Sequence, residues 1–142
     1  MLKAASKKEA DALDHQGSVV ARVYTSDAKI PVQGATVIFT KIAEDGQREL
    51  LAVRLTNYDG YTDPIFVDAP PLSDSRNYSP DANAYNIINI TAEENNYGRI
   101  LVRNVQVFPD TETVQEFMLI PSPMLPEQFG QTEVFVIPPQ NL

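Results

Sequence analysis

The sequence predicts an all-β fold, a seven- to eight-stranded Greek-key β-sandwich with extended N- and C-terminal arms. Three observations lead to this prediction. Short stretches that alternate apolar and β-branched residues with polar ones recur along the chain, Gly-, Pro- and Asp-rich turns separate them, and hardly any stretch has a helical period. Such spacing is typical of β-sandwiches. The 142 residues suffice for one core without disulfides or metals.

The first half of the chain predicts four strands. Residues 18–24, 35–42 and 49–56 alternate in hydrophobicity or are β-branched, and a fourth strand follows within YTDPIFVDAP. Pro64 interrupts this fourth strand, so we place it at a sheet edge. The sets expected to share one face within a strand are Val19, Ala21 and Val23; Ala35, Val37 and Phe39; and Leu51, Val53 and Leu55.

Turn residues separate these strands. Pro31 and Gly34 punctuate the first connection, where Gly34 fits a position that needs a positive φ. Asp45-Gly46 predicts a hairpin turn between the second and third strands. The small Ala35 would begin the second strand where side chains pack between the sheets.

The second half predicts three more strands, over residues 84–91, 99–108 and 112–120. A long loop rich in Pro, Ser and Asp, residues 70–83, precedes them. We therefore divide the chain into a polar arm (1–16), a β-sandwich domain (17–120) and a Pro-rich linker with a strand-like tail (121–142).

The tail contains an apolar β-prone segment, Glu133 to Ile137, that Pro138 and Pro139 terminate. A seven-stranded domain does not obviously need it. The segment either adds an eighth strand to its own sheet and covers an open edge, or pairs with a neighbouring subunit by strand addition. In the second case the residues that carry assembly are Val134, Phe135, Val136 and Ile137.

The composition of the chain disfavours two kinds of partner. The net charge of −8 disfavours nucleic acid and anionic membranes, because both are bound mainly through Lys and Arg clusters. The only cluster of basic residues along the sequence is Lys3, Lys7 and Lys8. No apolar run could span a bilayer and no signal peptide is visible, so we expect no membrane insertion.

The stretch from Gly17 to about Ile120 resembles the carboxypeptidase regulatory-like domain of the transthyretin-like group. The resemblance rests on GSVVARVY, PVQGATVIF, TNYDGYTD, VRNVQVF and VQEFMLIP, with PVQGA (31–35) the most specific piece. The later half is similar to small envelope- or spore-associated domains of clostridial-type bacteria. The resemblance implies a non-catalytic scaffold that stabilises or presents partners, located on the cell surface, on the spore surface or outside the cell.

No catalytic centre or cofactor is expected. The single histidine, His15, lies in the polar arm, and the chain lacks the His set and the Tyr-Arg-Gly-Ser end of the hydroxyisourate hydrolases, which share the transthyretin-like fold. A nucleophile would therefore have no visible base. Paired-carboxylate catalysis is disfavoured, because most acidic residues fall in turns. The acidic residues considered are Asp59, Asp63, Asp68, Asp74, Asp81, Glu93, Glu94 and Asp110.

Two ligand types stay open. Asn57, Asp59 and Asp63 are loosely spaced like a calcium loop, although an Asp-Gly turn explains them better. Tyr58, Tyr61, Tyr78 and Tyr97 fall in or near loops and could contact a glycan or a protein. We thus expect a structural subunit that self-assembles into a filament or other homo-oligomer. The alternative is a binding module for cell-wall carbohydrate or a protein partner.

Overall fold

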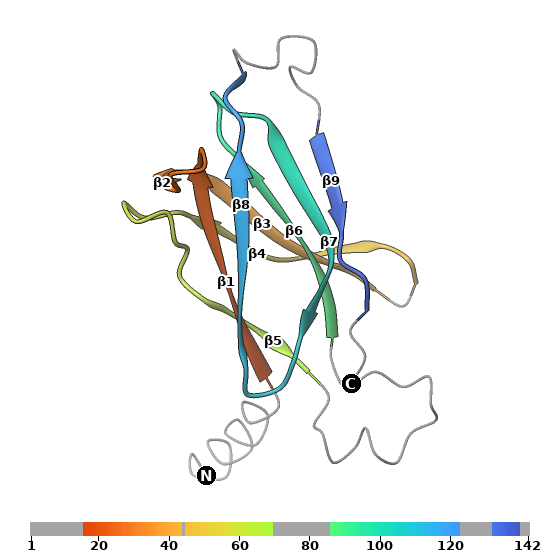
Figure 1. Cartoon of the computed structure of the whole chain (residues 1–142). Coiled ribbons are helices and arrows are strands. Elements are labelled where there is room, and N and C mark those ends of the chain that lie inside the picture. The colour runs from red at the N-terminus through yellow and green to blue at the C-terminus, as the bar shows by residue number, and fades with distance from the viewer. Residues whose placement is uncertain (1–15, 44, 70–85, 123–131, 140–142) are drawn as a thin grey trace.

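A computed structural model describes residues 16–43, 45–69, 86–122 and 132–139 (Figure 1). The described residues form nine strands. Their bounds are β1 (Gln16–Thr25), β2 (Ile30–Pro31), β3 (Thr36–Ile42), β4 (Arg48–Leu55), β5 (Ile65–Asp68), β6 (Asn86–Glu93), β7 (Arg99–Val107), β8 (Glu112–Leu119) and β9 (Thr132–Val136). The predicted N-terminal arm, apart from residue 16, and the loop over 70–83 lie outside the described residues.

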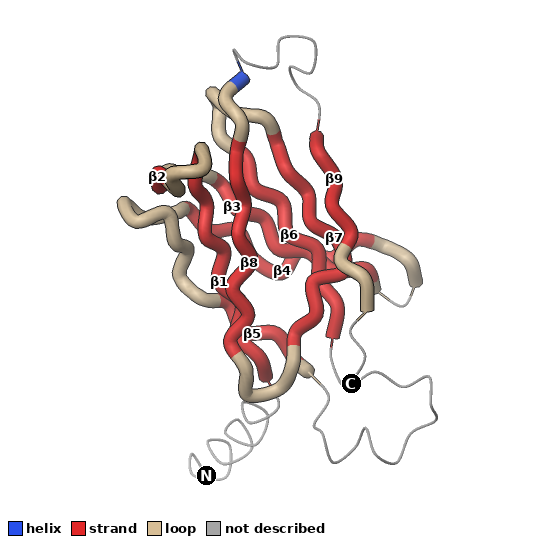
Figure 2. Tube along the Cα trace, viewed as in Figure 1, coloured by secondary structure: helices blue, strands red, loops and turns tan. Residues whose placement is uncertain are grey.

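The strands form two sheets that pack face to face, which confirms the predicted β-sandwich (Figure 2). In the smaller sheet, β2 and β5 pair antiparallel with the two ends of β1, and β8 pairs parallel with β1 along its other side. The larger sheet has the order β4-β3-β6-β7-β9 and is antiparallel except for the last pair. The Greek-key type remains a prediction.

The core lies between the inner faces of the two sheets. Val19, Ala21 and Val23 on β1 are fully buried, as are Ala35, Val37 and Phe39 leading into and along β3. The shared face predicted for each of these two sets is therefore confirmed, and it is the inner face. Each large apolar side chain of this kind stabilises the fold by about 1.5–3 kcal/mol when it leaves water, so the two sheets stay together without any disulfide.

The connection into β3 is held by a buried threonine. Gly34 has a φ of 77°, as its place in the turn predicted. The Thr56 hydroxyl at the end of β4 donates to the Val32 carbonyl oxygen (2.6 Å) and accepts from the Ala35 N–H (2.9 Å). Because buried backbone groups need partners, this hydroxyl satisfies two of them and ties the turn to the neighbouring strand.

The shared face predicted for the third strand is wrong. The ladder between β3 and β4 shifts register at Phe39/Thr40, so that Leu51 has no Cα partner and packs partly against the core. An extra residue in one strand reverses the alternation beyond it. Val53 and Leu55 consequently lie on the opposite, outer face and are 47% and 65% exposed.

The positions of two edge strands, β5 and β9, agree with what the sequence predicted or allowed. β5 starts directly after Pro64 and pairs with β1 alone, at the sheet edge where the proline placed it. β9 pairs with β7 of the same chain, which is the first of the two arrangements left open for the tail. The short strand β2 was not predicted, because its two residues fall inside a turn.

Candidate functional site

One surface stands out on the larger sheet, the face turned away from the core. A row of side chains crosses all five strands there, since Val53, Ile38, Thr91, Leu101 and Val134 are successive register partners. Partners in register lie on the same face of a sheet. The row therefore provides a continuous strip of apolar and hydroxyl groups on the outside of the sandwich.

This face is hollowed into a cavity of about 640 Å³, which we call the outer groove. Ile38, Thr91 and Leu101 from the central strands line it. The β6–β7 ladder is irregular between Ile88 and Ile90, and beside it Asn104 has a φ of 63°. Bulges of this kind bend a strand and redirect its side chains. The irregularity therefore lies in the wall of the groove rather than at a sheet end.

Polar side chains surround the apolar centre. Thr40, Asn89, Asn104 and Thr132 all line the outer groove. The Asn104 N–H donates to Asn89 Oδ1 (3.2 Å). Hydroxyl and amide groups can both donate and accept hydrogen bonds, so the groove can bind a ligand that carries many such groups.

The charge of the groove is opposite to that of the chain. Arg48, Arg99 and Arg103 line it, and Glu93 is the one acidic residue among the described residues of the lining. Arg99 Nε lies 2.7 Å from Glu93 Oε2, and Arg99 also donates to the Thr132 hydroxyl. Among the described residues, no carboxylate pairs with Arg48 or Arg103. The groove thus has a local excess of positive charge on a chain of net charge −8.

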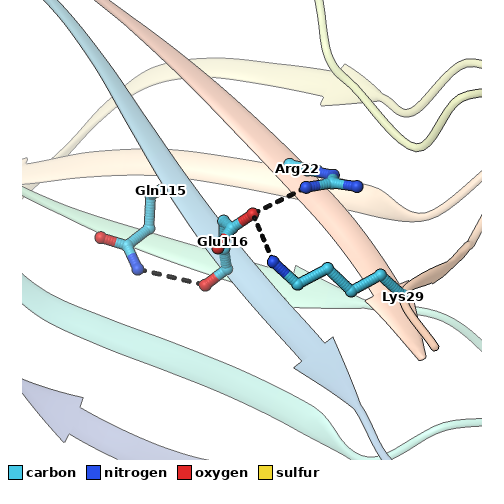
Figure 3. A network of polar contacts seen from close by, with 4 residues as sticks. All are labelled: Arg22, Lys29, Gln115 and Glu116. Atoms are coloured by element: carbon cyan, nitrogen blue, oxygen red, sulfur yellow. Dashed lines mark hydrogen bonds and ion pairs between the residues drawn. The ribbon is translucent and has the colours of Figure 1, made fainter. Parts of the chain in front are cut away.

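A second polar cluster lies on the outer face of the smaller sheet (Figure 3). Arg22 Nη1 lies 2.9 Å from Glu116 Oε2, and Lys29 Nζ is 3.9 Å from the same oxygen. The Arg22 guanidinium also lies 5.5 Å from the ring centres of both Tyr24 and Tyr61. These groups satisfy one another and join β1 to β8, so the cluster supports the sheet rather than presenting unpaired charge.

The four tyrosines predicted as ligand contacts do not form one surface. Tyr58 is 73% exposed, and Tyr61 in the same turn contacts Arg22. Tyr97 lies in the turn between β6 and β7 and packs against the core. Tyr78 lies outside the described residues.

The loop considered for calcium is a closed turn. Asn57 Oδ1 accepts hydrogen bonds from the N–H groups of Asp59 (2.9 Å) and Tyr61 (3.0 Å), and Gly60 has a φ of 84°. The side-chain oxygen that would bind the ion already serves the backbone, which favours the Asp-Gly turn. No group of three or more His, Asp or Glu side chains suited to a metal is found in the described part of the chain.

The remaining acidic residues are dispersed. Glu93 pairs with Arg99, and Asp68 accepts a hydrogen bond from Gln16 (3.0 Å). Asp63 and Asp110 are exposed in or next to turns. His15, Asp74 and Asp81 lie outside the described residues.

The tail residues predicted to carry assembly are paired within the chain but incompletely covered. Val134, Phe135 and Val136 are 48%, 50% and 59% exposed. Ile137 packs against the core, and its N–H donates to the Arg103 carbonyl oxygen (3.0 Å). Since β9 ends the sheet order, its second edge faces no other described strand.

Sequence reasoning missed the outer groove. Its arginines come from β4 and β7, which are far apart in the sequence, and no run of basic residues marks them. The only local signal is the spacing of Arg99, Leu101 and Arg103, which places three side chains on one face of a strand.

Comparison with solved structures shows the fold. The chain is similar to the Bacillus anthracis TIE protein, with 12% identity and a TM-score of 0.50 over 75% of this chain and 17% of that one. It is also similar to a cohesin–X-dockerin complex from Acetivibrio cellulolyticus, with 16% identity and a TM-score of 0.39 over 74% of this chain and 58% of that one. The chain thus spans about a sixth of the length of the TIE protein.

No protein-family model and no curated protein matches the chain. None of the described segments is a helix long and apolar enough to cross a bilayer. The fold and the groove together define the class as a β-sandwich domain with a hollowed outer sheet face.

Proposed function

We propose that this chain is a non-catalytic binding module that recognises its partner through the outer groove. The observation that carries the proposal is the cavity of about 640 Å³ on the outer face of the five-stranded sheet. A concave surface with a few convergent polar groups is the usual form of a binding site. The rigid strands beneath it hold the side chains in place without the ligand.

The side chains in the groove suit binding better than chemistry. The described lining residues are arginines, threonines, asparagines and aliphatic residues, and the one carboxylate among them, Glu93, is engaged by Arg99. Arginine and amide groups form fixed hydrogen bonds to a ligand. General acid–base catalysis instead needs a titrating group within reach of the reacting atoms.

Filling the groove tests this function. In Thr91→Trp, a large side chain occupies the centre of the groove, and we expect loss of co-sedimentation with insoluble Gram-positive cell walls. Phe66→Ala is the matched control, because Phe66 is 64% exposed on the smaller sheet. Loss of binding in the control but not in Thr91→Trp would place the site on the other sheet. No binding by the unaltered chain would contradict the function itself.

Self-assembly through the C-terminal strand is a second candidate. Val134, Phe135 and Val136 remain about half exposed although β9 is paired. In this candidate the same register with β7 forms between two copies, and the Pro-rich segment that precedes β9 in the sequence connects the exchanged strand to its own domain. Such an exchange would give a chain of copies or a closed ring.

Truncation after Gly130 tests assembly. We expect the full-length chain to form multimers in size-exclusion chromatography with light scattering, and the truncated chain to be a folded monomer. A Val134→Lys/Val136→Lys variant separates the contribution of main-chain pairing from that of apolar contacts. It keeps the backbone pairing and removes the apolar side chains. Assembly by the truncated chain, or a full-length monomer of 15.8 kDa, would contradict this candidate.

We also propose a cell-surface, spore-surface or extracellular location. It is supported by the resemblance of residues 17–120 to carboxypeptidase regulatory-like domains, which is itself part of the proposal. Immunogold labelling of intact cells and spores tests the location directly.

A further inference from the structure

We propose that the ligand of the outer groove is an acidic polysaccharide, a hydroxyl-rich polymer with repeated carboxylate or phosphodiester groups. The inference rests on the proposed binding function and names its ligand class. It follows from the arrangement of three arginines around a floor of hydroxyl and amide groups.

The spacing of the arginines suits a polymer better than a small anion. Arg99 and Arg103 lie on one face of β7, four residues apart, which is about 13 Å along a strand. Arg48 lies on β4, and three strand spacings alone separate it from β7 by about 14 Å. It is also at the end of the ladder opposite to Arg99. No single phosphate or carboxylate can contact all three, whereas a chain with repeated anionic groups can.

Arg48 and Arg103 are the groups available for this contact. Both are exposed, and neither takes part in an ion pair with a described residue. Charge-assisted hydrogen bonds from guanidinium to carboxylate or phosphate are about twice as strong as neutral ones. Arg99 is partly neutralised by Glu93 and contributes less.

The other lining residues favour a sugar chain over a peptide or a nucleic acid. Thr40, Asn89, Thr91 and Thr132 offer hydroxyl and amide groups across the floor, and a sugar ring has matching hydroxyls. None of the described residues that line the groove is aromatic. Single-stranded nucleic acid and neutral sugars are usually held by stacking on aromatic rings, so charge and hydrogen bonds must carry recognition here.

The acidity of the whole chain does not prevent this binding. Many described carboxylates, among them Asp63, Asp68, Glu112 and Glu116, belong to the smaller sheet or the segments next to it. At physiological ionic strength the Debye length is about 8 Å. The charges of the smaller sheet, on the far side of the sandwich from the groove, are therefore largely screened there, whereas the arginines contact the ligand directly.

The test compares an acidic polysaccharide with its uncharged ester and with two other anionic polymers. Isothermal titration of the full chain is carried out with polygalacturonate, with its fully methyl-esterified form, with a ribitol-phosphate polymer and with poly-glutamate. We expect binding of polygalacturonate or the phosphate polymer, and at least about tenfold weaker binding of the esterified form, which is a difference of about 1.4 kcal/mol. Which of the two acidic polymers binds identifies the source of the anionic groups.

Arginine variants locate the contact. Arg48→Gln/Arg103→Gln should weaken binding of the acidic polymer about tenfold or more, which equals about 1.4 kcal/mol. The control is Arg54→Gln, since Arg54 lies on β4 outside the groove lining and donates to the Val53 carbonyl oxygen. Equal thermal unfolding midpoints show that the variants are folded. Unchanged affinity in the double variant overturns the proposal.

The outcomes distinguish an error in the ligand class from an error in the binding function. Equal binding of the esterified polymer would overturn the acidic ligand and leave the binding function intact. Preferential binding of poly-glutamate would overturn the polysaccharide and identify an acidic protein as partner. If none of these polymers binds while the chain still sediments with cell walls through the groove, only the ligand class is wrong. If the wall binding also fails, the proposed function is wrong.

Discussion

Three of the described glycines have left-handed backbone conformations, but their surroundings differ. Gly34, Gly46 and Gly60 have φ values of 77°, 83° and 84°. A Cβ atom at Gly34 or Gly46 would meet no heavy atom within 4 Å, whereas at Gly60 it would collide with the Val23 carbonyl oxygen. That carbonyl also accepts the N–H of Val32, so it cannot easily move away.

This difference predicts two sizes of effect from the same substitution. Gly46→Ala should lower the free energy of unfolding by about 1–2 kcal/mol, the cost of a left-handed L-residue. Gly60→Ala should lower it by about 3 kcal/mol or more, because the collision displaces backbone atoms at the end of β1. Urea unfolding of both variants measures the two losses. Equal losses would show that the turn relaxes without cost.

For individual residues, the sequence predicts backbone conformation and burial better than it predicts contacts between side chains on the surface. The positive φ of Gly34 and the burial of Val37 and Phe39 follow from local rules of turns and strands. The pairing of Arg22 with Glu116 does not, because it depends on which strands become neighbours.

The strands differ in how firmly they are held. β1 has neighbours on both sides, and its inward residues Val19, Ala21 and Val23 are fully buried. β9 pairs with β7 alone and carries residues that are about half exposed. An element with one partner and little buried area opens with a smaller free energy than the centre of a sheet.

Amide hydrogen exchange should therefore separate these two strands. We expect amides of β1 to exchange more slowly than those of β9 by on the order of 100-fold, since β9 can leave without global unfolding. Mass spectrometry of peptides covering residues 17–25 and 132–137 measures this. Equal protection of the two peptides would mean that β9 opens only with the whole domain, and would count against its exchange between copies.

Strand positions could be predicted from the sequence more fully than strand partners. Alternating hydrophobicity, together with β-branched and apolar runs, located every described strand except the short β2. The bulge that moves Leu51 toward the core left no visible sign, because one extra residue does not change the composition of a strand. The parallel pairings of β8 and β9 depend on contacts far apart in the sequence, for which no local rule exists.

For the whole molecule, distant segments must meet before the sheets can form. The β1–β8 ladder joins residues 94 apart, as in the bond from Arg22 to Glu116. Closing such long loops costs entropy before contacts compensate for it, and proteins dominated by distant contacts fold in milliseconds to seconds.

Stopped-flow refolding from urea should thus give a main phase with a time constant of about milliseconds to seconds. A double-jump experiment separates any slower phase caused by proline isomerisation, which takes about 10–100 s. Refolding in microseconds would contradict a folding step that depends on the β1–β8 pair.

The outer groove forms only when the whole larger sheet is assembled. Arg48 becomes a neighbour of the β7 arginines when β4, β3, β6 and β7 align in one sheet. The net charge of −8 points away from an anionic ligand when the chain is taken as a whole. The sequence therefore predicts the sandwich, while the distribution of charge over its faces requires the strand order.

The two ends of the described chain lie near one corner of the sandwich, where β7 turns into β8. The Asp110 N–H donates to the Gln16 carbonyl oxygen, and Gln106 donates to the Pro138 carbonyl oxygen (2.9 Å). If the domain is anchored on both sides within a longer fibre, tension along the chain enters and leaves at this corner. The load then enters through β1 and leaves through β9, which has a single neighbour. We therefore expect stretching to detach β9 first and, with it, the Thr132 side of the outer groove.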